Sequence, residues 1–204
     1  NAGVYADDLE GLVITNNTFE AASGATADGI YTFDQNDYII EENYINVQDY
    51  ALYISDGNDG NSPSANPTVI NNMIISSSDY GMYLNDVEST NVFHNSVVGE
   101  PGIRINDDAG IDIRNNIFVS NGDFAFESDD PIDANTVLDY NLYYRTGTGD
   151  PFEIDGTGYV DLVAWQTADA SRNMNSLYGD PIFVSSEDLH IIGVLPNDAG
   201  DNSA

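Results

Sequence analysis

The chain has 204 residues, of which 35 are acidic and four are basic, so its formal net charge is −31. Disordered acidic chains carry such charges, but 41% hydrophobic residues, including 13 tyrosines and eight phenylalanines, supply a core that disordered chains lack. The negative surface of a folded domain disfavours nucleic acid, anionic membranes and polyanionic substrates. It favours cations, or a salty environment that screens repulsion beyond about 3 Å at 1 M salt.

The sequence contains no segment that we expect to insert into a membrane, because no hydrophobic run approaches the roughly 20 residues of a membrane span. The first residues lack the basic start and apolar centre of a signal peptide. Cysteine is absent, which fits a fold that needs no disulfide bonds. The first residues already match part of a repeat, so we expect the chain to be a segment of a longer protein.

A repeat runs through residues 3–144. Its first half is clearest in Asp79–Asp86 (DYGMYLND), which recurs at Asp49–Asp56 (DYALYISD) and Asp123–Asp130 (DFAFESDD). Its second half is an aliphatic residue, two further residues, an asparagine and, two residues later, another apolar residue. The asparagines, which lie 21 to 29 residues apart, are Asn17, Asn43, Asn72, Asn95, Asn116 and Asn141. A period of this length signals a solenoid whose units must stack to bury a core.

Each half-repeat alternates apolar and polar residues with period two, between clusters of Gly, Asn, Asp and Ser, which indicates strands and turns rather than helices. We predict one all-β domain over residues 1–204, a solenoid of about seven or more coils. Regular coils are expected over 1–144 and irregular C-terminal coils over 145–204. Turn-forming insertions are predicted at 56–67 and 21–28.

Beyond the regular repeat, residues 151–154 match a seventh first-half strand. Residues 160–168 contain the only tryptophan and predict a short helix packed on the stack. Residues 180–184 and 188–192 predict further strands.

The asparagine repeat with its Gly-Ile-x-Ile starts resembles the right-handed parallel β-helix (pectate-lyase-like) superfamily. The tail, DYNLYY followed by AWQ, DPIFV and DLHI, is similar to the end of β-helix regions in large secreted surface proteins. The resemblance implies a right-handed parallel β-helix. It leaves function open, because this fold hosts polysaccharide lyases, glycoside hydrolases, epimerases, adhesins and phage tailspikes.

Stacking predicts the role of each column, because equivalent residues of successive coils lie about 4.8 Å apart. The asparagines should point inward and form a hydrogen-bonded ladder, since a buried amide without a partner costs about 1–3 kcal/mol. Two columns of the first half-repeat should form the core. They are Val4, Ile30, Leu52, Met82, Ile103 and Phe126, and Ala6, Thr32, Ile54, Leu84, Ile105 and Ser128.

The column between these two should point outward, because side chains alternate along a strand. It contains Tyr5, Tyr31, Tyr53 and Tyr83, followed by Arg104 and Glu127. Stacked tyrosines beside acidic residues suit contacts along an extended sugar chain, so the four tyrosines are candidate glycan-binding residues. Alternatively, tyrosine is used here because it forms strands well and pairs across them.

A column of aspartates closes the first half-repeat: Asp8, Asp34, Asp56, Asp86, Asp107 and Asp130. Aspartate at a strand end caps a turn by bonding its own backbone. Alternatively, stacked carboxylates with a cation between them form an oxygen-rich site of the kind that Ca²⁺ prefers. The insertion at 56–67 adds further candidate oxygen ligands, Asp56, Asn58, Asp59 and Asn61. It lacks the spacing and the closing glutamate of an EF-hand.

Catalytic residues are harder to find. The chain has no lysine and only scattered arginines to serve as the base of a polysaccharide lyase. A glycoside hydrolase needs two carboxylates about 5–5.5 or 6.5–9.5 Å apart, which any aspartate ladder supplies by chance. For a lyase, only Arg104 beside the aspartate column could serve. For a hydrolase, the nearest approach to a catalytic cluster is Asp86, Asp107 and Glu127.

We therefore expect a structural or adhesive segment of a secreted or cell-surface protein, with glycan contact through the tyrosines. High salt is a candidate environment and Ca²⁺ a candidate ion. The expected partners are a polysaccharide, neighbouring copies of the chain or flanking domains, without nucleic acid. The alternative is a carbohydrate-active enzyme, a polysaccharide lyase or glycoside hydrolase of the pectate-lyase-like fold, which would require a concave site.

Overall fold

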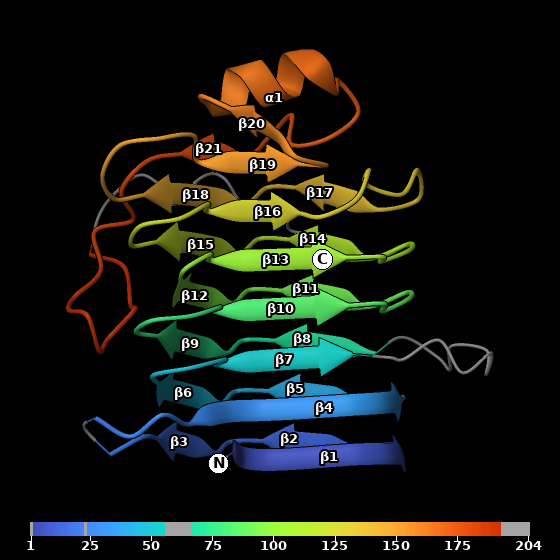
Figure 1. The fold of residues 1–204 in the computed structure, drawn as a ribbon, viewed down its shortest axis with the longest axis vertical. Coiled ribbons are helices and arrows are strands. Elements are labelled where there is room, and N and C mark those ends of the chain that lie inside the picture. The colour runs from blue at the N-terminus through green and yellow to red at the C-terminus, as the bar shows by residue number, and fades with distance from the viewer. Residues whose placement is uncertain (1, 23, 56–66, 193–204) are drawn as a thin grey trace.

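The computed structural model describes residues 2–22, 24–55 and 67–192. Its strands form three sheets wound around one core (Figure 1). Each coil contributes one strand to each sheet, so strands three apart in the chain pair in parallel. The all-β parallel solenoid is the architecture that the repeat predicted.

The strands of the three sheets are short. Sheet A contains β1 (Ala2–Glu10), β4 (Asp28–Asn36), β7 (Leu52–Ser55), β10 (Met82–Asn85), β13 (Ile103–Asn106), β16 (Phe126–Ser128), β19 (Phe152–Ile154) and β20 (Thr157–Tyr159). Sheet B contains β2 (Val13–Thr15), β5 (Ile39–Glu41), β8 (Thr68–Ile70), β11 (Asn91–Phe93), β14 (Asp112–Arg114) and β17 (Val137–Asp139). Sheet C contains β3 (Thr18–Glu20), β6 (Tyr44–Val47), β9 (Met73–Ser76), β12 (Ser96–Gly99), β15 (Ile117–Ser120), β18 (Leu142–Arg145) and β21 (Leu177–Tyr178).

The register brings the predicted columns together. Neighbouring strands of sheet A pair Tyr5, Tyr31, Tyr53, Tyr83, Arg104 and Glu127 in that order. Both predicted core columns are buried from the second coil onward. Within the described residues, sheet B has six strands and the other two sheets reach a seventh level. The stack therefore has six complete coils and a partial seventh, close to the predicted number.

The asparagines form the inward ladder that the repeat predicted. The five ladder asparagines from Asn43 to Asn141 are each at most 2% exposed, whereas Asn17 in the first coil is exposed. From Asn43 onward, each amide oxygen accepts two hydrogen bonds from the asparagine of the coil before it. Asn95 Oδ1, for example, lies 2.9 Å from the backbone nitrogen of Asn72 and 3.0 Å from its Nδ2. The ladder therefore satisfies polar groups that every coil buries at the same corner.

A short helix, α1 (Leu162–Ala168), covers the C-terminal end of the core (Figure 1), as predicted for residues 160–168. Asp161 caps it by accepting a hydrogen bond from the Ala164 N–H at 2.7 Å. Trp165 is 2% exposed, and its ring centroid lies 5.0 Å from that of Phe126 and 5.1 Å from that of Phe152. The described residues contain no helix of the length and apolarity that a membrane span requires.

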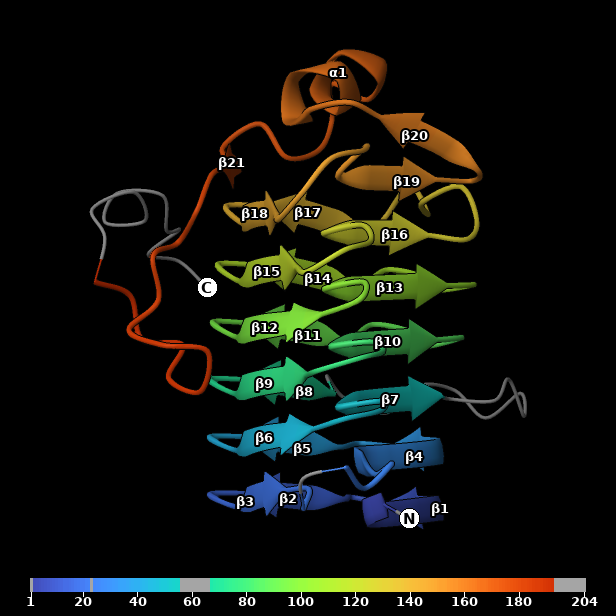
Figure 2. The ribbon, with the colours of Figure 1, turned by 60° about the vertical axis from the view of Figure 1, so that its left-hand side comes forward.

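The prediction of strands at 180–184 and 188–192 is wrong. These residues form one isolated antiparallel bridge, between Phe183 and Ile191, and no named strand. Gly179 to Ile192 instead runs back along the outer face of sheet C (Figure 2). The strands beneath it are already paired with each other on both sides, so the segment finds no ladder of backbone partners there.

This C-terminal segment gives sheet C a second, smaller core. Ile117, Val119 and Leu142 are at most 8% exposed although alternation points them outward. Phe183 packs against this group, and Leu189, near Met73, is 2% exposed. The sequence prediction did not include this second core, because it assigned no direction to the columns beside the apolar residues of the second half-repeat.

Candidate functional site

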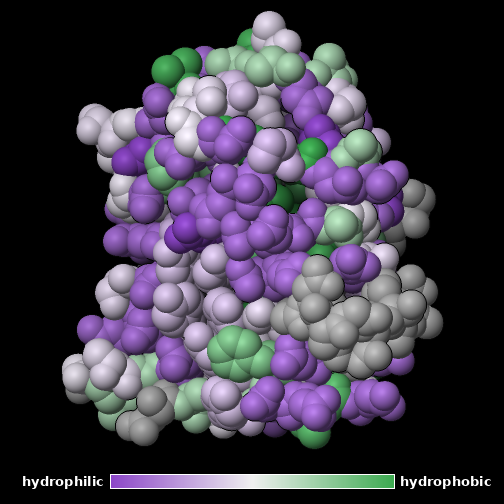
Figure 3. Space-filling model, turned by 45° about the vertical axis from the view of Figure 1, so that its right-hand side comes forward, coloured by the Kyte–Doolittle hydropathy of each residue, from purple (hydrophilic) through white to green (hydrophobic). Residues whose placement is uncertain are grey.

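The outer face of sheet A carries the column in which the sequence predicted a glycan site. We call it the sheet A face, and its central column is Tyr5, Tyr31, Tyr53, Tyr83, Arg104, Glu127 and Glu153. The column is aromatic in the first four coils and charged in the last three. Figure 3 shows hydrophilic side chains gathered across the middle of the stack.

The four predicted tyrosines form one continuous row of rings. Tyr31 and Tyr53 stack with ring centroids 4.4 Å apart, and Tyr5 stacks on Tyr31 at 6.2 Å. The ring of Tyr83 lies nearly perpendicular to that of Tyr53, at 5.2 Å. Tyr5 is 64% exposed and the other three are half-buried. Because stacked rings cover one another's faces, the row offers mainly ring edges and hydroxyl groups to a ligand.

A second pair of tyrosines lies beside this row, and the sequence prediction missed it. The rings of Tyr50 and Tyr80 stack 5.1 Å apart. Tyr50 is edge-on to Tyr31 and Tyr53, at 5.8 and 5.7 Å. The Asp-Tyr pair that begins these two repeats is visible in the sequence. These tyrosines precede their strands, however, where strand alternation does not predict side-chain direction.

Arg104 joins the aromatic and acidic parts of the sheet A face. Its guanidinium carbon lies 5.2 Å from the ring centroids of both Tyr80 and Tyr83, a cation–π arrangement. Its Nη2 lies 2.7 and 2.8 Å from the two carboxylate oxygens of Asp129. Its Nε lies 3.9 Å from the Glu127 carboxylate. Arg104 and Glu127 thus adjoin as predicted, whereas Asp129 was not foreseen.

Two carboxyl groups on this face hold protons unusually tightly. Burial raises the pKa of Glu127 to about 7, with Arg104 opposing the rise and Asp129 adding to it. Burial also raises the pKa of Asp79 to about 6, and the neighbouring Asp49 contributes to the rise. Both groups therefore titrate near neutral pH, where ordinary carboxylates are fully ionised.

We expect Glu127 to make stability depend on pH. Its pKa of about 7 exceeds its ordinary value of 4.5, so the folded chain binds this proton more tightly than the unfolded chain does. The resulting stabilisation is present below pH 4.5 and is lost as the pH rises through 7. Glu127→Gln should therefore match the parent Tm in acid and exceed it at alkaline pH, in scanning fluorimetry. Glu10→Gln, at an exposed position, is the control. Parallel profiles for the parent and Glu127→Gln would show that Glu127 titrates normally.

The other two predicted catalytic residues lie elsewhere. Asp86 and Asp107 occupy the turns after β10 and β13, three residues beyond Tyr83 and Arg104. Like Asp8 and Asp34, they have positive φ angles, of 57° and 52°. Aspartate tolerates this left-handed backbone better than most residues, which supports the turn interpretation of the column.

The structure supplies no assembled metal centre for the calcium interpretation. Within the described ranges, no group of three or more acidic or histidine side chains is placed to hold a metal ion. Asp108 is half-buried next to the predicted column, where its Oδ1 accepts a hydrogen bond from the Val87 N–H at 2.7 Å. Burial raises the pKa of Asp108 well above its ordinary value. The four candidate ligands of the insertion, Asp56, Asn58, Asp59 and Asn61, lie outside the described residues.

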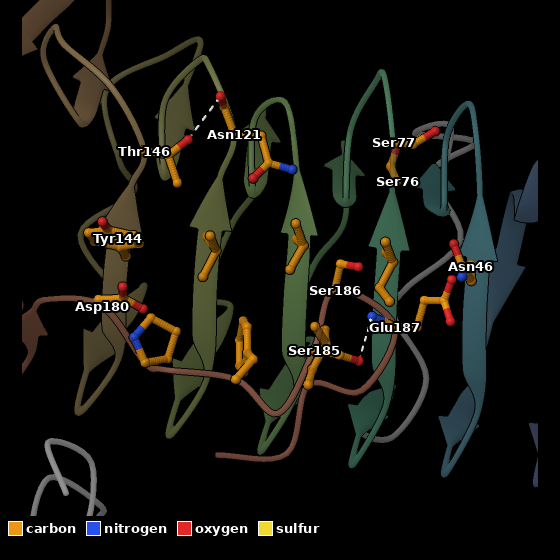
Figure 4. A pocket seen from close by; sticks show the side chains of 16 residues that line it. Asn46, Ser76, Ser77, Asn121, Tyr144, Thr146, Asp180, Ser185, Ser186 and Glu187 are labelled. Atoms are coloured by element: carbon orange, nitrogen blue, oxygen red, sulfur yellow. Dashed lines mark hydrogen bonds between the residues drawn. The ribbon is translucent and has the colours of Figure 1, made fainter. Parts of the chain in front are cut away.

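A groove of about 510 Å³ lies on a different face, between sheet C and the C-terminal segment (Figure 4). Ile75, Val98 and Val119 contribute apolar side chains to it. Asp180 and Glu187 line it from the C-terminal segment. The groove combines apolar and acidic groups but contains none of the residues that the sequence selected.

Comparison with known proteins bears on the fold. The model of a family described as a right-handed beta helix region matches residues 3–141, which is more than half of the chain. This range contains all six ladder asparagines, and it supports a right-handed winding of the coils. No curated protein matches the chain, and no solved structure matches it.

Proposed function

Because the chain belongs to the right-handed β-helix family, we propose that it is a structural rod whose sheet A face contacts an extended glycan. The observation that carries this proposal is the array of six tyrosines on one face of the stack. Each tyrosine offers the edge of an apolar ring and a hydroxyl group, which suits a ligand with apolar C–H groups and many hydroxyls. Each coil of the array repeats a similar contact along the stack, as an extended polymer requires.

The surrounding charges define the class of glycan. Burial raises the pKa of Tyr31 and that of Tyr50, and nearby carboxylates add to the rise. Asp28 and Asp49 act on Tyr31, and Asp79 and Asp49 act on Tyr50. A uronate polymer would be repelled by these carboxylates and by the net charge of −31. The proposed ligand is therefore a neutral glycan or one that carries amino groups.

We expect the parent chain to bind at least one member of a panel of neutral polysaccharides and chitosan oligosaccharides. It should not bind polygalacturonate. Combined Tyr31→Ala, Tyr53→Ala and Tyr83→Ala substitutions should weaken that binding at least about tenfold, because they remove the aromatic contacts. The measurement is affinity electrophoresis, followed by calorimetry on the best ligand.

Two further variants control this experiment. Phenylalanine at the same three positions keeps the rings and removes only the hydroxyls, and circular dichroism checks that each variant is folded. Tyr178→Ala removes an exposed tyrosine from sheet C and should leave binding unchanged. If the parent binds no member of the panel, or if Tyr178→Ala weakens binding as much, the tyrosine row is a structural feature of the strands only.

One observation favours a second candidate, a carbohydrate-active enzyme. Glu127 has a pKa of about 7, which suits a general acid, and Glu153 is its neighbour in the next strand. Release of reducing sugar by the parent chain, abolished in Glu127→Gln with binding retained, would establish this activity. Unchanged release in Glu127→Gln would exclude Glu127 from it.

The setting of the rod is part of the same proposal. An excess of acidic groups on a narrow stack suits a salty medium outside the cell, where cations screen the repulsion between coils. Flanking domains or neighbouring copies are its proposed protein partners. Calcium binding by the 56–61 segment remains a prediction.

A further inference from the structure

The groove on the outer face of sheet C is elongated along the stack. Its floor is one outward column, in which successive strands from β6 to β18 pair Asn46, Ile75, Val98, Val119 and Tyr144 in register. The four steps between these five strands, of about 4.8 Å each, give the floor a length of about 19 Å. The groove therefore suits a long and narrow ligand.

The middle of this floor is apolar and its two ends are polar. Ile75 and Val119 are each 6% exposed, and Val98 lies partly buried between them. Asn46 lies at one end of the column and Tyr144 at the other. A ligand that follows the floor therefore crosses three aliphatic side chains between two polar ones.

The C-terminal segment adds one carboxylate near each end of the floor. Figure 4 shows Asp180 beside Tyr144 and Glu187 beside Asn46. Asp180 Oδ1 accepts a hydrogen bond from the Ile182 N–H at 2.8 Å, which orients this carboxylate. No described residue that lines the groove is basic, so neither carboxylate has a cationic partner there. The groove thus presents an anion, an apolar strip and a second anion.

The wall that carries these carboxylates is anchored to sheet C. Leu189 is 2% exposed, Pro181 is buried, and Phe183 packs against the smaller core. A bridge also pairs Phe183 with Ile191. The groove is therefore formed before a ligand arrives, as most small-molecule sites are, and its volume of about 510 Å³ is typical of them.

A polypeptide is a poor occupant of this groove. A chain that follows the floor runs across the strands of sheet C, whose backbone groups already pair with the neighbouring strands. The N–H and C=O groups of a bound peptide would therefore lie over aliphatic side chains without partners, which is unfavourable. A methylene chain carries no polar groups, so it has no such cost.

We propose that the sheet C groove binds a slender dication, an alkyl chain with an ammonium group at each end. The chain lies over Ile75, Val98 and Val119, and the ammonium groups pair with the carboxylates of Asp180 and Glu187. The net charge of −31 attracts cations to the whole molecule, whereas two separated carboxylates select the distance between two charges. This site lies on a different face from the sheet A tyrosines and does not depend on the glycan proposal.

Calorimetry with diamines of different length, at fixed ionic strength, tests the proposal. From ordinary bond lengths, extended diaminododecane spans about 16 Å between its nitrogens and diaminohexane about 9 Å. With a hydrogen bond of about 2.8 Å at each end, only the longer diamine spans the floor. It also buries more methylene groups. We expect the parent chain to bind diaminododecane at least about tenfold more tightly than diaminohexane.

Spermine separates this site from general attraction to a negative protein. It carries two additional ammonium groups within its chain, so overall electrostatics favours it over diaminododecane. In the groove, however, these inner ammonium groups would lie over aliphatic side chains, away from both carboxylates. We expect spermine to bind more weakly than diaminododecane. Equal or tighter binding of spermine, or no binding of diaminododecane, would overturn the proposal.

Two substitutions test the ends of the site. Asp180→Asn and Glu187→Gln each remove one carboxylate at an exposed position, so both variants should fold. Each should weaken diaminododecane binding at least about threefold. Asp7→Asn is the control, because it removes an exposed carboxylate from β1 of sheet A and should leave the affinity unchanged. An equal loss in Asp7→Asn, or no loss in either groove variant, would show that the diamine binds through overall charge and would also overturn the proposal.

Discussion

Replacement of Asn95 by leucine is expected to lower the free energy of unfolding by at least about 3 kcal/mol, because several buried groups lose partners that each contribute about 1–3 kcal/mol. Asn95 Oδ1 accepts from the backbone and the side chain of Asn72. Its Nδ2 donates to the carbonyls of Val69 and Phe93. For a chain of this size the loss corresponds to a fall in Tm of about 6–12 °C.

Asn17→Leu is the matched control for this substitution. Asn17 occupies the same ladder position but is exposed, so water satisfies the groups that lose their partner. Its effect on Tm should be much smaller than that of Asn95→Leu. Equal effects at the two positions would show that the ladder does not stabilise the stack through buried hydrogen bonds.

Trp165→Ala is expected to cost about 3–5 kcal/mol, because truncation of a buried tryptophan leaves a cavity. Its ring contacts Phe126, Tyr143 and Phe152 at the C-terminal end of the core. Loss of the ring should lower Tm by about 6–20 °C.

Val163→Ala controls for the helix itself, since Val163 is on the same helix but 67% exposed. The control should shift Tm little. A Tm for Trp165→Ala within a degree or two of the control would mean that α1 is not the closing element of the stack.

The repeat explains why so much of the fold was predictable from the sequence. The ladder asparagines recur at intervals of 21 to 29 residues, and a residue such as Tyr53 is constrained by equivalents in the coils on both sides. Period-two alternation then fixes which columns face inward. The helix at 162–168 could be predicted because a tryptophan-containing segment without the repeat pattern follows the last coils.

The missed features depend on contacts and side-chain directions that the repeat pattern does not encode. Nothing in the local pattern indicates that Leu189 lies near Met73, far earlier in the chain. Nor does the pattern show that Asp129, one coil beyond Arg104, would bind its guanidinium. Tyr50 and Tyr80 were visible as residues, but their direction depends on the turn before the strand. Candidate sites were therefore less predictable than the fold.

The most direct test of the proposed function is hydrogen exchange of the parent chain with and without the best polysaccharide of the panel. Binding along the sheet A face should slow exchange in β4, β7 and β10 and leave residues 180–189 unchanged. Slowed exchange confined to residues 180–189 and the sheet C strands beneath them would place the ligand in the 510 Å³ groove and contradict the proposal.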